Sequence, residues 1–472
     1  MFHRKAVEDL QSWYNGKKRK PLVIRGARQV GKTTAVRLAA ERLSVPLVEI
    51  NLERHPDLEP LFRSYRVEEL LFSISLINGQ EITRSSRAIL FFDEAQAIPA
   101  AYSCLRYFYE DMPELAVVLT GSLLDQTLHD YQFPYPVGRV EQYFMGPFTF
   151  MEFLTATEER KAIDVLEQLT WKNVHLLSDQ VHGYLLSKVR QYTLTGGMPY
   201  CVQIAVDNRF THAEIVKHQV QLIQAYKDDF SKYTGSQTAL KLGAFFDALL
   251  SQVGLQFSHK QANEIASSTS GDNRQLNAAI ERFVEARLFY RVLHTNANHI
   301  PPGADVKIRI SKFLFIDIGL LLAAQGIPAQ QIMNSPLELT NRGVVAEQFV
   351  GQQLLGAKPG YVLPSLYYWH PPKAEGQAEI DFLYEHDNRI YPVEVKSGSR
   401  GSIKSIHSYV IKKQADCAIR ISSAKPSINN LVAKVRGQER AFRLLNLPFY
   451  LLDHLDRMLA FPANAGTPDV LP

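Results

Sequence analysis

A short run near the N-terminus has the residue types and spacing of a phosphate-binding loop. The sequence GARQVGKTT carries Gly26, Gly31, Lys32 and Thr33 in the pattern G-x-x-x-x-G-K-[ST]. Glycines let backbone N–H groups turn inward around phosphates, which also face the positive end of a following helix. We expect Lys32 to reach the β- and γ-phosphates and the Thr33 hydroxyl to ligand Mg²⁺. The expected nucleotide contacts in this loop are Gly26, Ala27, Arg28, Gln29, Val30, Gly31, Lys32, Thr33 and Thr34.

Two consecutive acids follow about 60 residues later. In RAILFFDEAQ, Asp93 and Glu94 come directly after an apolar run that is typical of a central parallel strand. Asp93 is expected to hold Mg²⁺ through water, and Glu94 to polarise the water that attacks the γ-phosphate. An acid pair after a strand can also be a strand cap. The preceding phosphate-binding loop favours the catalytic interpretation.

Three further residues are candidates for the same site. Thr120 ends the apolar run LAVVLTGS, where it would lie beside the acids of the previous strand and sense the γ-phosphate. Arg139, in the turn VGRV, can stabilise transition-state charge in its own subunit or in a neighbour's. A surface salt bridge is the alternative for Arg139. Arg28, inside the loop, is a further candidate contact.

A second group of charged residues lies in the C-terminal part of the chain. Asp381 and Glu394 sit in apolar strand sequences, where unpaired charge is costly to bury, and Lys396 follows Glu394 on the same strand face. Two carboxylates on adjacent strands suit Mg²⁺, with Glu347 on a helix as a further ligand. Lys396 can orient or deprotonate a metal-bound water. The alternatives are a buried ion-pair network that only specifies the fold, or a site that binds DNA without cutting it.

The elements that must position these side chains indicate an α/β protein. The phosphate-binding loop lies between an apolar strand, PLVIR, and an amphipathic helix, and further apolar strands precede the acids and Thr120. From about residue 156 the pattern becomes helical, with a turn at Gly196–Pro199 that serves geometry rather than chemistry. Residues 238–295 read as three helices and a strand, which is winged-helix order. The third helix is not notably basic, so protein docking or a structural role competes with DNA contact there.

Around the C-terminal acids the pattern is again mixed. The run NRGVVAEQFVGQQLLG predicts a helix with Ala346, Val350 and Leu354 on one buried face and Glu347 beside it. The strands LYYWH, AEIDFLYEH and RIYPVEVKS follow, with a turn at residues 387–388, and KSIHSYVIKKQADCAIRI predicts a helix and a strand.

Composition excludes several classes of protein. The chain has 472 residues, of which 46% are apolar and 21% charged, and this is typical of a globular protein. Its three cysteines form no CxxC pair, which argues against a disulfide framework or a zinc cluster. No signal peptide or membrane span is evident, so a cytoplasmic location is expected. Residues 389–443 carry 12 Lys or Arg against three acids, and Lys17–Lys20 form a second basic cluster. Such surfaces suit DNA, although solvated lysines are the simpler alternative.

Together, GARQVGKT, FFDEAQ, LTGS and GRVEQYFMGPFTFMEFL resemble a prokaryotic branch of the AAA-type ATPases. This resemblance implies an αβα core that uses ATP and Mg²⁺, followed by a C-terminal domain of unknown function with a nuclease-like core. The helix–strand–strand–strand order carrying Glu347, Asp381 and Glu394-x-Lys396 resembles the PD-(D/E)XK nucleases. The resemblance does not supply a biological role.

The expected fold class is therefore α/β, with a P-loop αβα ATPase core, a helical and winged-helix-like middle, and a C-terminal α/β restriction-endonuclease-like domain. The expected boundaries are 1–20 for an N-terminal helix and basic segment, 21–155 for the core, 156–237 for a helical extension, 238–300 for the winged-helix-like module, 301–460 for the nuclease-like domain and 461–472 for a flexible tail. Two functions fit this organisation. One is ATP hydrolysis coupled to a DNA-binding, nuclease-like domain. The other is a nucleotide-gated switch that binds a protein partner and has a catalytically silent C-terminal domain. A homo-oligomer is compatible with both.

Overall fold

A computed structural model describes residues 2–121, 136–208, 210–232, 236–265, 273–337, 343–372, 378–395 and 403–460. The chain divides into two compact units. Unit 1 contains residues 1–147, 281–288 and 358–364, and unit 2 contains 148–280, 289–357 and 365–472. The domain boundaries expected from the sequence remain a prediction, and the tail 461–472 lies outside the described residues.

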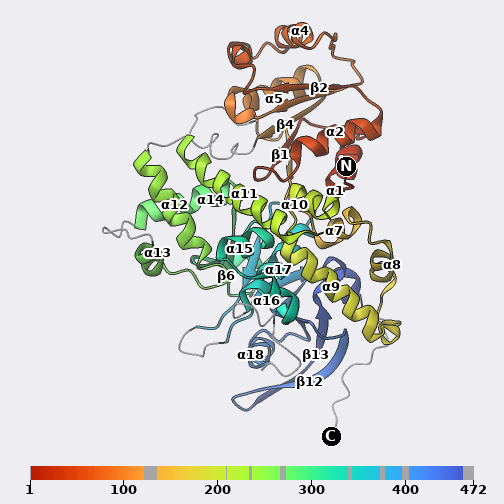
Figure 1. Ribbon diagram of the computed structural model, residues 1–472, viewed down its shortest axis with the longest axis vertical. Helices are drawn as coiled ribbons and strands as arrows, with labels where there is room; N and C mark the ends of the chain where they lie inside the picture. Colours follow the sequence, from red (N-terminus) through yellow and green to blue (C-terminus); the bar gives the residue numbers. More distant parts are fainter. Residues whose placement is uncertain are drawn as a thin grey trace. The chain divides into compact units, whose positions relative to one another are not determined.

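Unit 1 is built on a five-stranded parallel sheet with the strand order β2-β3-β4-β1-β5 (Figure 1). Its helices and strands are α1 (Lys5–Tyr14), β1 (Leu22–Arg25), α2 (Lys32–Leu43), β2 (Leu47–Asn51), α3 (Glu59–Ser64), α4 (Val67–Asn78), β3 (Ile89–Asp93), α5 (Ala100–Asp111), β4 (Ala116–Gly121) and β5 (Glu141–Phe144). Because all strands run in one direction, their carboxyl ends meet at one edge of the sheet. The expected strand–loop–helix around the phosphate-binding loop is confirmed as β1, the loop and α2.

The central strands β3 and β4 of unit 1 are buried on both faces because helices cover both. All five residues of β3 and all six of β4 are buried, as expected for central parallel strands. Phe92 and Leu119 face a core formed with α3, α4 and α5, in which Phe62 and Phe108 pack against Phe92. On the other face α2 contacts β3 and β4, and α1 packs on α2. This burial fixes the sheet whose edge carries the candidate site.

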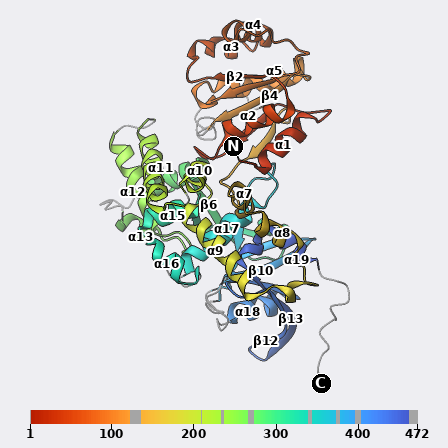
Figure 2. The same cartoon turned by 45° about the vertical axis from the view of Figure 1, so that its right-hand side comes forward.

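Unit 2 combines a helical part with two sheets (Figures 1 and 2). Its first elements are α7 (Phe150–Ala156), α8 (Arg160–Gln168), α9 (Asp179–Thr195), α10 (Pro199–Asp207), α11 (His212–Lys232), α12 (Ser236–Leu250), α13 (His259–Ile265), α14 (Asn273–Glu285), β6 (Phe289–Thr295), β7 (Val306–Phe315), α15 (Ile318–Gln325) and α16 (Ala329–Asn334). The last residues of α14 cluster with unit 1. Three helices and a strand thus lie where the sequence predicts them, and β6 pairs antiparallel with β7. The winged-helix interpretation itself remains a prediction.

The remaining elements of unit 2 are α17 (Val344–Gly356), β8 (Leu366–Tyr368), β9 (Phe382–His386), β10 (Arg389–Val395), α18 (Lys404–Lys413), β11 (Cys417–Ser422), β12 (Ser427–Val435), β13 (Gln438–Pro448) and α19 (Leu455–Leu459). One sheet has the order β12-β13-β11-β10-β9 and the other β7-β6-β8. The helix α18 packs on the five-stranded sheet (Figure 2). The expected turn is confirmed: residues 387–388 both have positive φ and join β9 to the antiparallel β10.

Helix α17 differs from its expected form. Ala346, Val350 and Leu354 are buried as predicted, but Gln348 and Gln353, on other sides of the helix, are at most 1% exposed. The helix is enclosed on nearly every side, and its glutamine amides bond to neighbouring groups: Gln348 exchanges two hydrogen bonds with the backbone of Phe315. The glutamines in this helix therefore form buried hydrogen bonds and do not lie on a solvent-exposed face.

A buried aspartate organises the turn that joins α9 to α10. Asp317 is fully buried and accepts hydrogen bonds from the backbone N–H groups of Gly197 (2.6 Å) and Leu320 (3.1 Å) and from Gln352 (3.0 Å). Gly196 has φ +73°, and a Cβ there would lie 2.0 Å from the Asp317 carboxylate. The prediction that this turn serves geometry is consistent with these contacts. Among the described helices, none is long and apolar enough to cross a membrane.

Candidate functional site

The loop between β1 and α2 lies at the carboxyl edge of the unit 1 sheet. Gly26 has a conformation in which a Cβ would lie 2.2 Å from the carbonyl oxygen of Met145, and Gly31, at the start of α2, has φ +94°. Both positions therefore favour glycine. Gln29 also has positive φ, while Ala27 and Val30 are buried and Thr34 is exposed. The backbone of the loop is thus folded tightly at the N-terminus of a 12-residue helix.

Lys32 is folded back into the loop. Its Nζ atom donates hydrogen bonds to the carbonyl oxygens of Gly26 and Ala27, both at 2.8 Å, and the residue is 8% exposed. Burial lowers the pKa of Lys32 to about 8, although the nearby carboxylates of Glu94 and Asp93 favour the charged form. The charge of Arg28 lowers this pKa further, which places the Arg28 side chain within the electrostatic reach of the site.

Asp93 joins residues from three elements of unit 1. Thr33, at the start of α2, donates from Oγ1 to Asp93 Oδ2 at 2.8 Å. Thr120, near the end of β4, is fully buried and donates its hydroxyl to Asp93 Oδ1. The structure therefore brings together the loop, the acid and the polar residue of the next strand, as the sequence predicts.

Glu94 follows Asp93 in a left-handed conformation, with φ +53°. Its backbone N–H donates to Asp93 Oδ1 at 3.0 Å, and its side chain accepts a hydrogen bond from the amide of Gln96. A non-glycine residue in this region is uncommon and is typical of functional turns. Gln96 was not identified from the sequence, although it stands two residues after Glu94 in DEAQ.

The sequence also missed Arg4. This side chain is 7% exposed and donates to the carbonyl oxygens of Val30 (2.7 Å) and Gly146 (2.9 Å). Because Val30 is part of the phosphate-binding loop, Arg4 fixes the loop to the segment after β5. No local pattern marks such a residue, since its partners lie 26 and 142 positions away.

Arg139 lies in an ion pair rather than beside the loop lysine. Its Nε atom is 3.1 Å from Glu110 on α5, which also binds Arg106 at 3.1 Å. These two arginines lower the pKa of Glu110. The salt-bridge alternative for Arg139 describes this arrangement, and a role at the nucleotide of a neighbouring subunit remains a prediction.

The C-terminal charged residues gather around a lysine that the sequence did not identify. Lys312 on β7 is 4% exposed, lies 3.4 Å from Glu347 on α17 and forms an ion pair with Glu379. The carboxylates of Glu347, Glu379 and Asp381 raise the pKa of Lys312 against the opposing effect of burial. Burial raises the pKa of Glu347 to about 8, with Lys312 acting in the opposite direction. Lys312 could have been recognised as a buried, paired lysine from its position in the apolar run SKFLF.

The predicted metal ligands are only partly assembled. Asp381 lies just before β9 and accepts a hydrogen bond from the Val395 backbone N–H at 2.7 Å, so it stands opposite Glu394 of β10. Glu394 is 1% exposed. Lys396 lies outside the described residues. Within the described ranges, no group of three or more His, Cys, Asp or Glu side chains is placed to hold a metal ion. The assignment of Asp381, Glu394 and Glu347 as magnesium ligands therefore remains a prediction.

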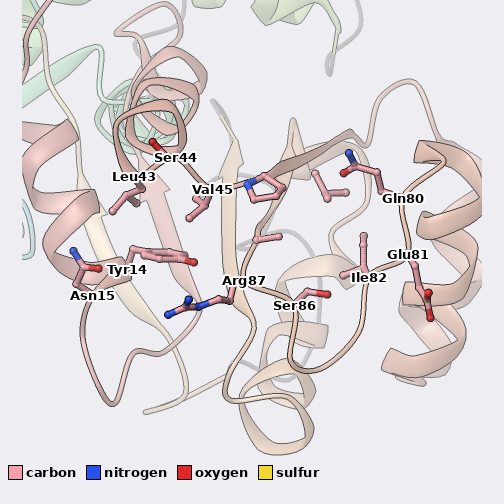
Figure 3. Close-up of a pocket in the computed structure, with 13 residues that line it drawn as sticks. Tyr14, Asn15, Leu43, Ser44, Val45, Gln80, Glu81, Ile82, Ser86 and Arg87 are labelled. Atoms are coloured by element: carbon pink, nitrogen blue, oxygen red, sulfur yellow. The ribbon is translucent and has the colours of Figure 1, made fainter.

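A separate cavity of about 810 Å³ opens in unit 1. It is lined by the end of α1, the α2–β2 connection and the segment before β3, with Tyr14, Ser44, Glu81 and Arg87 among its side chains (Figure 3). These segments lie at the amino ends of β2 and β3. The cavity is therefore at the opposite edge of the sheet from Lys32 and Asp93, and it is no part of the candidate site.

Comparison with known proteins agrees with the geometry of unit 1. Residues 18–154 match the model of a family described as an AAA domain. With the parallel sheet and the phosphate-binding loop, this match supports an AAA-type P-loop ATPase. Residues 186–331 and 342–442 match two further families, each described as a domain of unknown function. No curated protein matches the sequence significantly.

Several solved structures are distantly similar. A Walker-type ATPase of Pyrococcus abyssi is 14% identical, with 69% of this chain and 96% of that chain covered and a TM-score of 0.42. The Orc1 protein of Aeropyrum pernix, solved in complex with DNA, is 12% identical, with 70% and 93% covered and a TM-score of 0.27. The Holliday junction branch migration motor RuvB of Thermotoga maritima is 14% identical, with 65% and 93% covered and a TM-score of 0.29.

Proposed function

We propose that this protein hydrolyses ATP in a Mg²⁺-dependent reaction at the carboxyl edge of the unit 1 sheet. The observation that carries the proposal is the position of Asp93, which accepts hydrogen bonds from Thr33 and Thr120 beside the loop that contains Lys32. A strand cap needs only the local backbone. Here the carboxylate instead joins the helix after the loop to the next strand, and this supports a role for Asp93 beside the phosphates.

The residues of the loop bind and orient the phosphates. Backbone N–H groups of residues 26–34 and the N-terminus of α2 provide donors and positive potential for them. The Lys32 ammonium gives up its bonds to the carbonyl oxygens of Gly26 and Ala27 and turns to the phosphates. Thr33 and Asp93 are the residues that would hold Mg²⁺, whose chemistry is to neutralise phosphate charge.

Glu94 acts on the attacking water. Its carboxylate orients that water or accepts a proton from it. Before the reaction, a hydrogen bond from the Gln96 amide positions the carboxylate. Thr120 senses the γ-phosphate through its bond to Asp93. Arg28 contributes positive charge within the site, and Arg139 is a candidate to do so from a neighbouring subunit of a homo-oligomer.

Steady-state ATP turnover and nucleotide binding test this assignment in the full-length chain. Lys32→Ala should lose binding or turnover, whereas Glu94→Gln should bind ATP and hydrolyse it slowly, by a factor of roughly 10²–10⁴ for loss of a general base. Glu69→Gln is a matched control, because Glu69 pairs with Arg66 on the surface of α4 and should not affect turnover. Normal turnover by Glu94→Gln would show that the general base is another group.

We further propose that unit 2 binds DNA. The succession α17, β8, β9, β10, α18, β11 follows the order expected of a nuclease-like core, and β10 and β11 pair in parallel. Lys404 and Lys412 of α18 are candidates for phosphate contacts. Both side chains lie on the exposed side of α18, where Lys412 Nζ is 5.9 Å from the centre of the Trp369 ring.

Salt-dependent DNA binding tests this second proposal. Each phosphate contact removed should reduce the magnitude of the negative slope of log affinity against log salt by about 0.9. The charge reversals Lys404→Glu and Lys412→Glu should therefore flatten the dependence, whereas Lys161→Glu, on the exposed face of α8, should not. Unchanged binding in the α18 variants would exclude Lys404 and Lys412 as the phosphate contacts. Absence of DNA binding by the wild-type chain would favour the other candidate, a nucleotide-gated switch for a protein partner. The ion pairs of Lys312 at the C-terminal carboxylates are the observation that favours this alternative.

A further inference from the structure

The C-terminal carboxylates already surround a positive charge that is built into the chain. Lys312 projects from β7 and contacts two of them directly: its Nζ atom lies 3.4 Å from Glu347 Oε2 and forms an ion pair with Glu379. Asp381 is close enough to act electrostatically on the same ammonium. The Nζ atom also lies 5.4 Å from the centre of the Tyr368 ring, which favours a cation.

Because Lys312 is buried, these contacts replace the water that would otherwise solvate its ammonium group. The residue is 4% exposed, and lysines are almost never this buried unless they are paired. Its partners come from α17 and from the segment before β9, so one ammonium holds together three parts of unit 2. Removal of the ammonium would leave the partly buried carboxylates of Glu347 and Glu379 and the buried Asp381 close together without this positive charge.

We infer that Lys312 is the permanent counter-ion of this carboxylate centre, which therefore takes no divalent cation and does not cut nucleic acid by metal-dependent hydrolysis. This inference goes beyond ATP hydrolysis in unit 1 and does not depend on it. It assigns to Lys312 the compensation of the Glu347, Glu379 and Asp381 charges that a divalent cation would otherwise provide.

The geometry distinguishes Lys312 from a lysine that assists a metal. A lysine that activates water in a metal site approaches the water, while the carboxylates remain directed at the metal. Lys312 instead contacts the carboxylates of Glu347 and Glu379 themselves. An oxygen of Asp381 is also committed, because it accepts the Val395 backbone N–H at 2.7 Å. A metal ion would have to displace the ammonium and leave it buried beside a second positive charge.

Manganese binding to the full-length, nucleotide-free chain tests the inference directly. The chain carries Asp93→Asn, so that the nucleotide site does not contribute, and bound Mn²⁺ is measured by electron paramagnetic resonance. We expect no saturable Mn²⁺ site while Lys312 is present. A saturable site that disappears on the additional change Asp381→Asn would overturn the inference, and this result requires no change at Lys312.

Replacement of the lysine supplies the complementary result. Lys312→Met removes the ammonium from a side chain of similar length, and we expect one saturable Mn²⁺ per chain to appear in it. Lys312→Arg retains a cation and should bind none. If Lys312→Met is folded by circular dichroism and still binds no Mn²⁺, then Lys312 is not what excludes the metal and the inference is wrong.

Nuclease assays provide an independent measurement on the wild-type chain. Incubation with plasmid, branched and single-stranded DNA in Mg²⁺ or Mn²⁺ should give no cleavage above that of the Asp381→Asn protein. Metal-dependent cleavage that Asp381→Asn abolishes would overturn the inference. Failure of ATP hydrolysis would leave both the manganese and the cleavage results unchanged, so the two proposals can fail separately.

Discussion

Replacing Arg4 by methionine is expected to loosen the phosphate-binding loop, although Arg4 itself is not one of the expected nucleotide contacts. The guanidinium donates two hydrogen bonds, one to Val30 inside the loop and one to Gly146 after β5. Charge-assisted hydrogen bonds contribute about 1.5–3 kcal/mol each, so their joint loss amounts to roughly 3–6 kcal/mol. Water can reach part of the space that Arg4 leaves, so we expect a net destabilisation of about 2–4 kcal/mol. Nucleotide affinity should fall as well, because the loop must be reordered on binding.

The stability of unit 1 can be followed separately in the full-length chain. The sequence has three tryptophans, and Trp13, which donates to the Lys20 carbonyl, is the one in unit 1. Labelling with 5-fluorotryptophan therefore gives a fluorine resonance that reports the urea unfolding of this unit. Arg37→Met is the matched control: Arg37 binds Glu49 at the surface, and removal of such a pair should cost less than about 1 kcal/mol. Equal midpoints for Arg4→Met and Arg37→Met would refute the assigned role of Arg4.

Three further predictions concern titration and burial. Because the pKa of Lys32 is lowered to about 8, ATP affinity measured by isothermal titration calorimetry should fall as pH rises above 8, by up to about tenfold per pH unit. A flat profile of the wild-type chain between pH 7.5 and 9.5 would show that titration of Lys32 does not control binding. Asp317→Ala leaves buried donors unsatisfied and should destabilise unit 2 by about 3–5 kcal/mol in urea unfolding, whereas Asp416→Ala, at an exposed pair, should cost less than about 1 kcal/mol. A similar cost for both would contradict the role of Asp317. Burial lowers the pKa of His454 to about 4, so the unfolded chain binds a proton that the folded chain does not between pH 6.5 and 4. Stability should therefore fall by about 2 kcal/mol as pH decreases through this window, after allowance for partial exposure, and His454→Gln should lose this part of the dependence. An unchanged acid sensitivity of His454→Gln would exclude this histidine as its source.

The geometry of the candidate nucleotide site could be predicted because its residues follow local order in the sequence. A buried strand, a glycine-containing loop and a helix are consecutive, so Gly26, Gly31 and Lys32 are placed by their immediate neighbours. Asp93 and Thr120 are not local to the loop, but both end parallel strands, and such ends meet at one edge of the sheet. The sequence motif and the topology of a parallel sheet therefore place these residues at the same edge.

Residues whose partners are distant in sequence could not be predicted in this way. Arg4 reaches Val30 and Gly146 from a helix start that has no distinguishing pattern. Gln348 and Gln353 look like surface positions of an amphipathic helix, yet their amides bond inside unit 2. In each case the polar side chain bonds to backbone atoms. Because every residue type carries these atoms, the sequence does not show which residue is the partner.

The two acidic centres differ in the kind of donor that faces each carboxylate. Asp93 accepts from the hydroxyls of Thr33 and Thr120, which are neutral and can rotate, so water or a cation can replace them at little cost. The carboxylates of Glu347 and Glu379 face an ammonium that is covalently attached to β7 and has lost its own hydration. Replacing the Lys312 ammonium would require another cation to enter while the ammonium itself remains buried nearby. The same residue type therefore supports an adaptable site in unit 1 and a fixed ion-pair network in unit 2.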